Sequence, residues 1–328
     1  MAKAEHALIR HQEVGNSFEG TYYVESVYVK KTVQQKDYSD LVLRDKSGSR
    51  NVKYWGVIQD LAKGNFVWMS AVVEEYMGAP SLIAKNIEKA ELPEDMSNYI
   101  PECEDAEGGT ARFDAVRAEI AELESRIGDS TAGSLVDDVY NNQTFFSKFV
   151  VAPGSAKPHY GRTGGLLVGT VRTAEECGRM AAAYGLDDRE RVVLLVSALL
   201  AKIGAVDAYE FVDCVPSVTK KGMLVGLGNL TMSRVSLAAK RVMAAMVKAG
   251  GNVDQEIIDR ILHAVASCDS KSVLPMTKEA MVINAVCRTD SEMVAALDFI
   301  SNDQNMAEEF TAWDSSMGRK YYVGVRGV

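Results

Sequence analysis

The chain has no hydrophobic run long enough to span a membrane. Its longest apolar stretch, from Val192 to Leu200, contains a serine and falls far short of the roughly 18 to 20 residues that a membrane helix needs. The opening residues, Met1 to His6, contain no apolar region of the kind found in secretory signals. We therefore expect a cytoplasmic protein that has no membrane partner.

Cysteine and histidine are scarce in this sequence. The 328 residues include 5 cysteines, which never form a C-x-x-C pair, and 4 histidines. This arrangement excludes a disulfide framework and argues against a structural zinc site. We expect reduced thiols and no metal or other cofactor.

A net positive charge is also missing, since the formal net charge is −9. The acidity lies in the middle of the chain, where residues 91–150 contain 4 Lys and Arg against 14 Asp and Glu. The counts are 12 against 11 for residues 1–90 and 20 against 20 for residues 151–328. Because net charge acts on solubility and on the surrounding field, both flanking regions can still carry local basic surfaces.

The composition, 47% hydrophobic and 25% charged, is typical of a globular protein with material for two domains. Between residues 20 and 91, five runs rich in β-branched and aromatic residues are separated by turn residues. The runs are Thr21–Val29, Tyr38–Leu43, Arg50–Trp55, Phe66–Val73 and Ser81–Ile87. Five short strands in about 70 residues are typical of a small Greek-key barrel, and we predict an OB-fold.

The composition changes after the fifth run. Residues 92–111 are acidic and contain proline and glycine, which predicts a linker. We expect that removal of the acidic segment Glu91–Glu107 leaves folding intact. From Arg112 to Ile127 the apolar residues are three and four apart, the spacing of one helical stripe, and the pattern stays helical beyond. The predicted fold class is an α+β multidomain protein, in which a five-stranded OB-fold barrel precedes an all-α domain. Its segments are an N-terminal arm (1–17), the OB-fold (18–91), the acidic linker (92–111), the helical domain (112–310) and a basic, aromatic tail (311–328).

Several segments of the helical region resemble, in order, an HD-type phosphohydrolase domain. His159–Thr170 resembles the family's opening helix, Ser197–Ala205 its G-A-L-L-H-D-I-G-K core and Gly222–Gly226 its G-K-L-L-G-H motif. Leu262–Ser267 and Leu274–Ala280 resemble the stretches around S-H-H-G and P-x-T-x-E-A. With the barrel segments Tyr38–Gly48 and Val52–Trp55, residues 18–300 resemble the YhaM-type 3′-to-5′ exoribonucleases.

This resemblance implies a metal site that the chain no longer has. HD enzymes hold divalent metals with histidines and aspartates, and the metals generate hydroxide. The corresponding positions here are Gly169, Ala201, Lys202, Leu227 or its neighbour, Cys268, Asp269 and Cys287, and the family's later lysine is Ala205. A lysine ammonium repels a metal ion. We therefore expect a domain without catalytic residues, in which His159 and His263 are structural or lie on the surface.

Other chemical interpretations have less support. The glycine-rich segments Gly161–Gly165 and Gly222–Gly228 lack the pattern of a phosphate-binding loop. Cys268 and Cys287 could act as nucleophiles with His263, although buried cysteines usually pack as small hydrophobic residues. We find no helix with the concentrated basic face that duplex DNA recognition requires.

Aromatic and basic residues are interleaved in the barrel region, and single-strand binding uses both kinds for stacking and for phosphate contacts. Alternation along a strand places Lys53 and Trp55 on one face and Tyr54 on the other, so one of the two rings should face the core. The tail repeats this composition, although it could instead pack against its own domain. The candidate nucleic-acid-binding residues are Lys30, Lys31, Tyr38, Arg44, Lys46, Lys53, Trp55 and Tyr76, with Arg319, Lys320 and Tyr321 in the tail.

We therefore predict a non-enzymatic single-stranded nucleic-acid-binding protein that acts in replication or transcription. DNA is favoured over RNA, because a nuclease architecture without its metal can hold a strand and leave it intact. The HD-like domain would serve as a scaffold that forms a homo-oligomer. The loss of metal-ligating residues from an enzyme domain suits a viral accessory protein. The alternatives are a metal-dependent exoribonuclease or phosphohydrolase with altered ligands, and a protein-interaction module.

Overall fold

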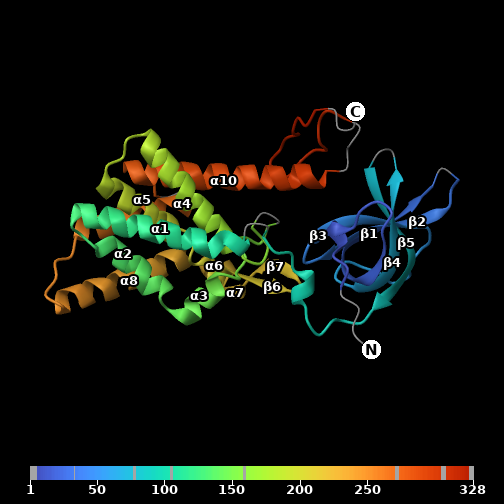
Figure 1. The fold of residues 1–328 in the computed structure, drawn as a ribbon, viewed down its shortest axis with the longest axis horizontal. Coiled ribbons are helices and arrows are strands. Elements are labelled where there is room, and N and C mark those ends of the chain that lie inside the picture. Colours follow the sequence, from blue (N-terminus) through green and yellow to red (C-terminus); the bar gives the residue numbers. More distant parts are fainter. Residues whose placement is uncertain are drawn as a thin grey trace. The chain divides into compact units, whose positions relative to one another are not determined.

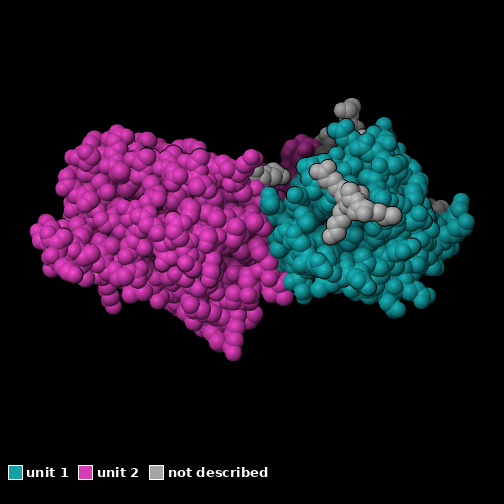
Figure 2. Space-filling view, turned by 60° about the horizontal axis from the view of Figure 1, so that its bottom comes forward, with its two compact units in different colours: residues 1–102, 213–215 teal, residues 103–212, 216–328 magenta. Residues whose placement is uncertain are grey.

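A computed structural model describes residues 6–32, 34–76, 79–103, 106–157, 160–269, 273–303 and 308–324. The chain divides into two compact units, which Figure 2 shows in different colours. The first comprises residues 1–102 and 213–215, and the second comprises residues 103–212 and 216–328. Each unit is described by itself.

The first unit is a closed five-stranded barrel (Figure 1). Its strands are β1 (Ser17–Lys31), β2 (Asp37–Asp45), β3 (Gly48–Tyr54), β4 (Phe66–Tyr76) and β5 (Ala79–Ala90). They follow the order β1-β2-β3-β5-β4, and β4 closes the barrel by pairing with β1. All pairs are antiparallel except β3 with β5. This Greek-key order is that of an OB-fold, and it confirms the barrel predicted from the five runs.

Alternation along the strands builds the barrel core. Leu41, Val52, Val67 and Met69 point inward and are fully buried. The N-terminal arm contributes too, because Ile9, in the short helix η1 (Ile9–His11), is also fully buried. The residues before β1 are therefore part of the barrel's packing.

The segment predicted to be a linker has structure in both halves. In its first half, helix η2 (Ser97–Tyr99) buries Tyr99, whose ring lies 4.9 Å from that of Phe66 in a T-shaped arrangement. In its second half, helix α1 begins at Ala106, six residues before the predicted start at Arg112. Acidic residues are favourable in the first turn of a helix, where Glu107 stands, so the acidic composition does not prevent helix formation.

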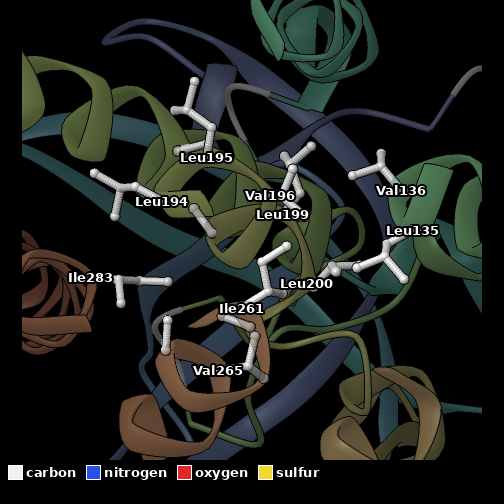
Figure 3. Packing of buried hydrophobic residues seen from close by; sticks show 14 of the residues in the cluster. Leu135, Val136, Leu194, Leu195, Val196, Leu199, Leu200, Ile261, Val265 and Ile283 are labelled. Atoms are coloured by element: carbon white, nitrogen blue, oxygen red, sulfur yellow. The ribbon is translucent and has the colours of Figure 1, made fainter. Parts of the chain in front are cut away.

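The second unit is mostly helical (Figure 1). Its helices are α1 (Ala106–Ile127), α2 (Thr131–Tyr140), α3 (Gln143–Phe149), α4 (Gly165–Ala183), α5 (Asp188–Leu200), α6 (Ala205–Ala208), α7 (Lys220–Val225), α8 (Leu227–Lys248), α9 (Gln255–Asp269) and α10 (Lys278–Asn302). The apolar run that is too short for a membrane is α5, which contacts α1, α2, α4, α9 and α10. Figure 3 shows Leu195 and Leu199 of α5 among side chains of these neighbours, such as Leu135 and Ile283. The last nine residues of α5, Val192–Leu200, are all buried, and a helical segment that is apolar all round is expected to be central.

The helical region also contains one short β-hairpin, which the all-α expectation did not include. Strands β6 (Tyr209–Val212) and β7 (Val215–Val218) form a two-stranded hairpin. Its two turn residues, Asp213 and Cys214, have φ angles of 47° and 64°, the left-handed conformation that tight hairpin turns require.

In the part of the chain that the structure describes, no helix is long and apolar enough to cross a membrane.

Candidate nucleic-acid interface

One row of side chains crosses the outer face of the barrel from β1 to the end of β3. Lys30 of β1 is paired in register with Tyr38 of β2. The rings of Tyr38 and Trp55 lie 5.3 Å apart between centroids, tilted by 46°. Trp55 is 59% exposed although it is the largest side-chain type. The row therefore presents two adjacent rings with a cation at one end.

A second, parallel row lies one pleat away. Tyr28 of β1 is in register with Asp40 of β2, and Asp40 is in register with Lys53 of β3. Tyr28 is 62% exposed, whereas Tyr54, the neighbour of Lys53, packs against the barrel core. Of the two neighbouring rings, that of Tyr54 faces the core and that of Trp55 faces outward, as strand alternation requires.

Tyr76 extends this surface at the end of β4. The Nζ atom of Lys53 lies 5.3 Å from the centroid of the Tyr76 ring, within the range of a cation–π contact. Tyr76 is 61% exposed. We call Tyr28, Tyr38, Lys53, Trp55 and Tyr76 the aromatic platform.

A hollow adjoins the platform beside the loop between β1 and β2. Its lining consists of Thr32, Gln34, Lys36, Asp37 and Trp55. Four of these five side chains are polar, and the indole ring of Trp55 supplies the apolar wall. The hollow can therefore accept a flat group that stacks on Trp55 and forms hydrogen bonds along its edge.

Most cations around the platform already have partners. Lys30 forms an ion pair with Asp40, and the hydrogen bond from Lys30 to that carboxylate raises the pKa of the ammonium. Nζ of Lys31 lies 3.3 Å from a carboxylate oxygen of Asp37. Lys46 is exposed. The platform is therefore rich in rings and close to neutral in charge, a combination that favours stacking over phosphate attraction.

Arg44 does not lie on this surface, which corrects the sequence-based candidate set. It is 7% exposed, and its guanidinium donates hydrogen bonds to the carbonyl oxygens of Tyr99 and Cys214 at 3.1 and 2.6 Å. A third bond reaches Glu25 at 2.6 Å. Because helix η2 contacts the end of β2, the usual in–out alternation stops there and Leu43, Arg44 and Asp45 are all buried.

Of the three candidate residues in the tail, one is packed against its own unit and two are exposed. The Tyr321 hydroxyl donates to Asp314 at 3.1 Å, and its ring lies 5.9 Å from that of Phe299 in α10. The tail folds back through bridges between Asp314 and Arg319 and between Phe310 and Tyr322. Tyr321 therefore packs within its own unit, while Arg319 and Lys320 are exposed.

Cys268 and Cys287, two residues at positions that the sequence resemblance predicts for metal ligands, lie side by side. The sulfur atoms of Cys268 and Cys287 are 3.1 Å apart. The hydrogen bond between the two thiols and their burial raise the pKa of Cys268, while the charge of Lys202 lowers it by a smaller amount. A protonated thiol is a poor nucleophile, so the geometry fits packing and argues against covalent catalysis.

A tyrosine fills the space beside Gly169. A Cβ atom at Gly169 would lie 3.3 Å from the Tyr160 ring. The Tyr160 hydroxyl donates to the buried carboxylate of Asp290, at 3.0 and 2.9 Å from its two oxygens. Burial, followed by the charge of Asp290, raises the pKa of this phenol. A side chain at position 169 would therefore require the Tyr160 ring to shift by a few tenths of an ångström.

The histidines do not assemble a ligand set. Nε2 of His263 accepts a hydrogen bond from the backbone N–H of Met276 at 2.9 Å, which makes this imidazole a structural link between α9 and the segment before α10. His159 and the side chain of Asp269 lie outside the described residues. Among the side chains that are described, no group of three or more His, Cys, Asp or Glu residues could hold a metal ion.

No protein-family model and no curated protein matches this chain. Solved structures of two OB-fold domains match part of the chain. The second OB-fold domain of replication protein A from Methanococcus maripaludis is 18% identical with a TM-score of 0.23, and the match covers 28% of this chain and 100% of that domain. An OB domain from Methanosarcina mazei is 19% identical with a TM-score of 0.23, and the match covers 27% of this chain and 84% of that domain. The OB-fold assignment itself follows from the strand order of the barrel.

Proposed function

We propose that this protein binds single-stranded nucleic acid, DNA in preference to RNA, through the aromatic platform of its barrel. The observation that carries the proposal is the pair formed by the exposed ring of Trp55 and the half-buried ring of Tyr38, with Lys53 and the exposed Tyr76 beside it. Exposed rings on neighbouring strands are what unpaired bases stack on, and each stacked base contributes about 1 to 3 kcal/mol. Paired bases in a duplex do not offer their faces, so the platform favours single strands.

The helical unit is proposed to be a scaffold without catalytic activity. Its resemblance to HD phosphohydrolases of the YhaM type rests on sequence segments, and their ligand positions hold Lys202, Cys268 and Cys287. Lys202 is close enough to Cys268 to act on its pKa, so a divalent cation there would meet an ammonium group and protonated thiols. We propose that this unit supports strand binding in replication or transcription and associates with other copies of the chain.

A titration of labelled oligonucleotides with the full chain tests this function. DNA and RNA of one sequence should be compared at several salt concentrations, because phosphate contacts make the affinity fall with salt. Salt-dependent binding that is tighter for DNA supports the proposal. A chain that binds neither strand would refute it and leave the protein-interaction module as the alternative. Repeating the titration with Mn²⁺ or Mg²⁺ and examining the strands for cleavage tests the alternative of an exoribonuclease.

A further inference from the structure

Positive charge is concentrated in one part of the helical unit. Residues 220–253, which include α7 and α8, contain six Lys and Arg residues and no Asp or Glu. The whole chain has a net charge of −9, so this segment differs sharply from its surroundings. The expectation that no helix has a concentrated basic face overlooked it, because α8 also carries an apolar stripe that dominates its sequence pattern.

The cations of α8 lie on its solvent side. Lys240, Arg241 and Lys248 are exposed, and so is Ser233. Positions 233, 237, 240, 244 and 248 follow one another at intervals of three or four residues, so they lie along one face of the helix, and position 241 is adjacent to 240 on the same side. The opposite face, with Val235 and Ala238 fully buried, packs into the core. The exposed face therefore combines positive charge with small side chains, the hydroxyl group of Ser233 and the apolar side chain of Leu237, which is 53% exposed.

Only part of this charge is neutralised. Asp207 pairs with Arg234 at 2.6 Å and lies 3.6 Å from Lys221, and Asp138 takes two hydrogen bonds from Arg241 through Nε, at 3.0 and 3.1 Å. In the described part of the chain, Lys220, Lys240 and Lys248 form no ion pair. Two carboxylates thus face six cations, which leaves an excess of about four positive charges.

A hollow between α2, α3 and α8 interrupts this face. Asn142, Arg234, Leu237 and Arg241 line part of it, and the Arg234 guanidinium lies 4.9 Å from the centroid of the Phe145 ring. Asp138 lines the same hollow and accepts hydrogen bonds from Arg241, and Arg234 is paired with Asp207. Both guanidinium groups are therefore already neutralised, and the excess positive charge of this face comes mainly from its three unpaired lysines.

We propose that the exposed face of α7 and α8 is a second nucleic-acid contact surface, which binds the sugar–phosphate backbone of the strand. This inference rests on the proposed function and adds to it. The aromatic platform has rings but few free cations, whereas the α7–α8 face has free cations and no exposed ring on α8. A single strand needs both kinds of contact, so the two surfaces supply complementary parts of the binding energy.

Strand length separates the two surfaces experimentally. The variant K220Q/K240Q/K248Q removes the three unpaired ammonium groups and keeps similar side-chain size. An oligonucleotide of about 8 nucleotides is within the site size of one OB-fold, whereas one of about 40 nucleotides can also reach a second surface. The control variant K157Q/R179Q/K278Q removes the same number of exposed charges from other elements of this unit.

For the long strand, the triple variant should lower the slope of log K against log salt by about 2, since each lost contact contributes about 0.7 on a single strand. Its affinity for the short strand should equal that of the unaltered chain, and the control should match the unaltered chain for both strands. Equal salt slopes in the variant and the control would overturn the proposal. It would also be overturned if the triple variant had an altered mass in solution but bound the strands as before, because this face would then be a contact between copies of the chain.

The outcomes for the two proposals are distinct. If the unaltered chain fails to bind the short strand but binds the long one in a manner that depends on these lysines, the aromatic platform is refuted and the α7–α8 surface stands. If the unaltered chain binds both strands, and the triple variant binds each of them with unchanged affinity and salt slope, the platform stands and the second surface is refuted. If neither strand binds, both proposals are refuted.

Discussion

Replacing Trp55 by alanine should weaken strand binding and leave the protein folded. The ring is 59% exposed and contacts Tyr38 at the surface, so its removal leaves no buried cavity. Exposed substitutions of this kind usually change the stability by about 0.5 kcal/mol or less. Loss of one stacked base costs about 1 to 3 kcal/mol, which corresponds to an affinity about 5-fold to 150-fold lower, since 1.4 kcal/mol is tenfold.

Fluorescence anisotropy with a labelled single strand and thermal unfolding should be measured on the same protein samples. The salt slope of W55A should equal that of the unaltered chain, because stacking releases no counterions. Tyr184→Ala is the matched control, since Tyr184 is 71% exposed and belongs to the helical unit. Phe66→Ala provides the opposite reference, because Phe66 is 2% exposed and its loss should cost about 3 to 5 kcal/mol of stability.

A folded W55A variant that binds with full affinity would refute the platform. If Trp313→Ala, at a residue 61% exposed in the tail, then abolishes binding, the strand site belongs to the tail beside Arg319 and Lys320. If W55A instead lowers the melting temperature as much as the Phe66 variant does, the ring is a packing residue and the exposure argument is wrong.

Three further outcomes test the fold and the proposed lack of catalysis. Tyr99→Ala should destabilise the barrel by about 3 to 5 kcal/mol, the cost typical of a large buried aromatic ring, and an unchanged melting temperature would show that the segment after β5 is a free linker. Arg112 donates hydrogen bonds to Glu175 at 2.8 and 2.7 Å and holds the pKa of this carboxyl below its ordinary value of 4.5. The stabilisation is therefore complete above that value and is lost as the pH falls through the lowered pKa. The melting temperatures of Glu175→Gln and the unaltered chain should differ at about pH 7 and converge once the pH falls below the lowered pKa. A difference that grows on acidification would reverse this assignment. Incubation of single-stranded RNA or DNA with Mn²⁺ should give no hydrolysis by the chain, and turnover that is lost when His263 is replaced would restore the phosphohydrolase alternative.

The barrel could be predicted from local sequence because its strands are short, regular and separated by turn residues. The runs from Thr21 to Ile87 each fall within an observed strand or extend one residue beyond it, and their pairing follows from the compact Greek-key arrangement. The hairpin of β6 and β7 could not be predicted in this way. It consists of two four-residue strands joined by the non-glycine turn residues Asp213 and Cys214, so neither length nor turn chemistry marks it.

Exposure of the candidate residues was only partly encoded in the sequence. Strand alternation correctly placed Lys53 and Trp55 outside and separated them from Tyr54, because alternation is a local property of a pleated strand. For Arg44, the same rule failed because a segment more than fifty positions away in sequence covers the end of β2. The ring of Tyr321 is likewise held by Phe299 and Asp314, contacts that only the folded chain brings together.

The sequence by itself determined which residues can stack, which can neutralise phosphates and which cannot hold a metal, because these properties belong to the side chains. Only the tertiary structure decided which of them are available. It placed Tyr38 against Trp55, paired Lys30 with Asp40, buried Arg44, and left Lys240 and Lys248 exposed on a helix that has no acidic residue. The physical reason is that availability depends on burial and on neighbouring charges, and both are set by contacts between segments that are distant in sequence.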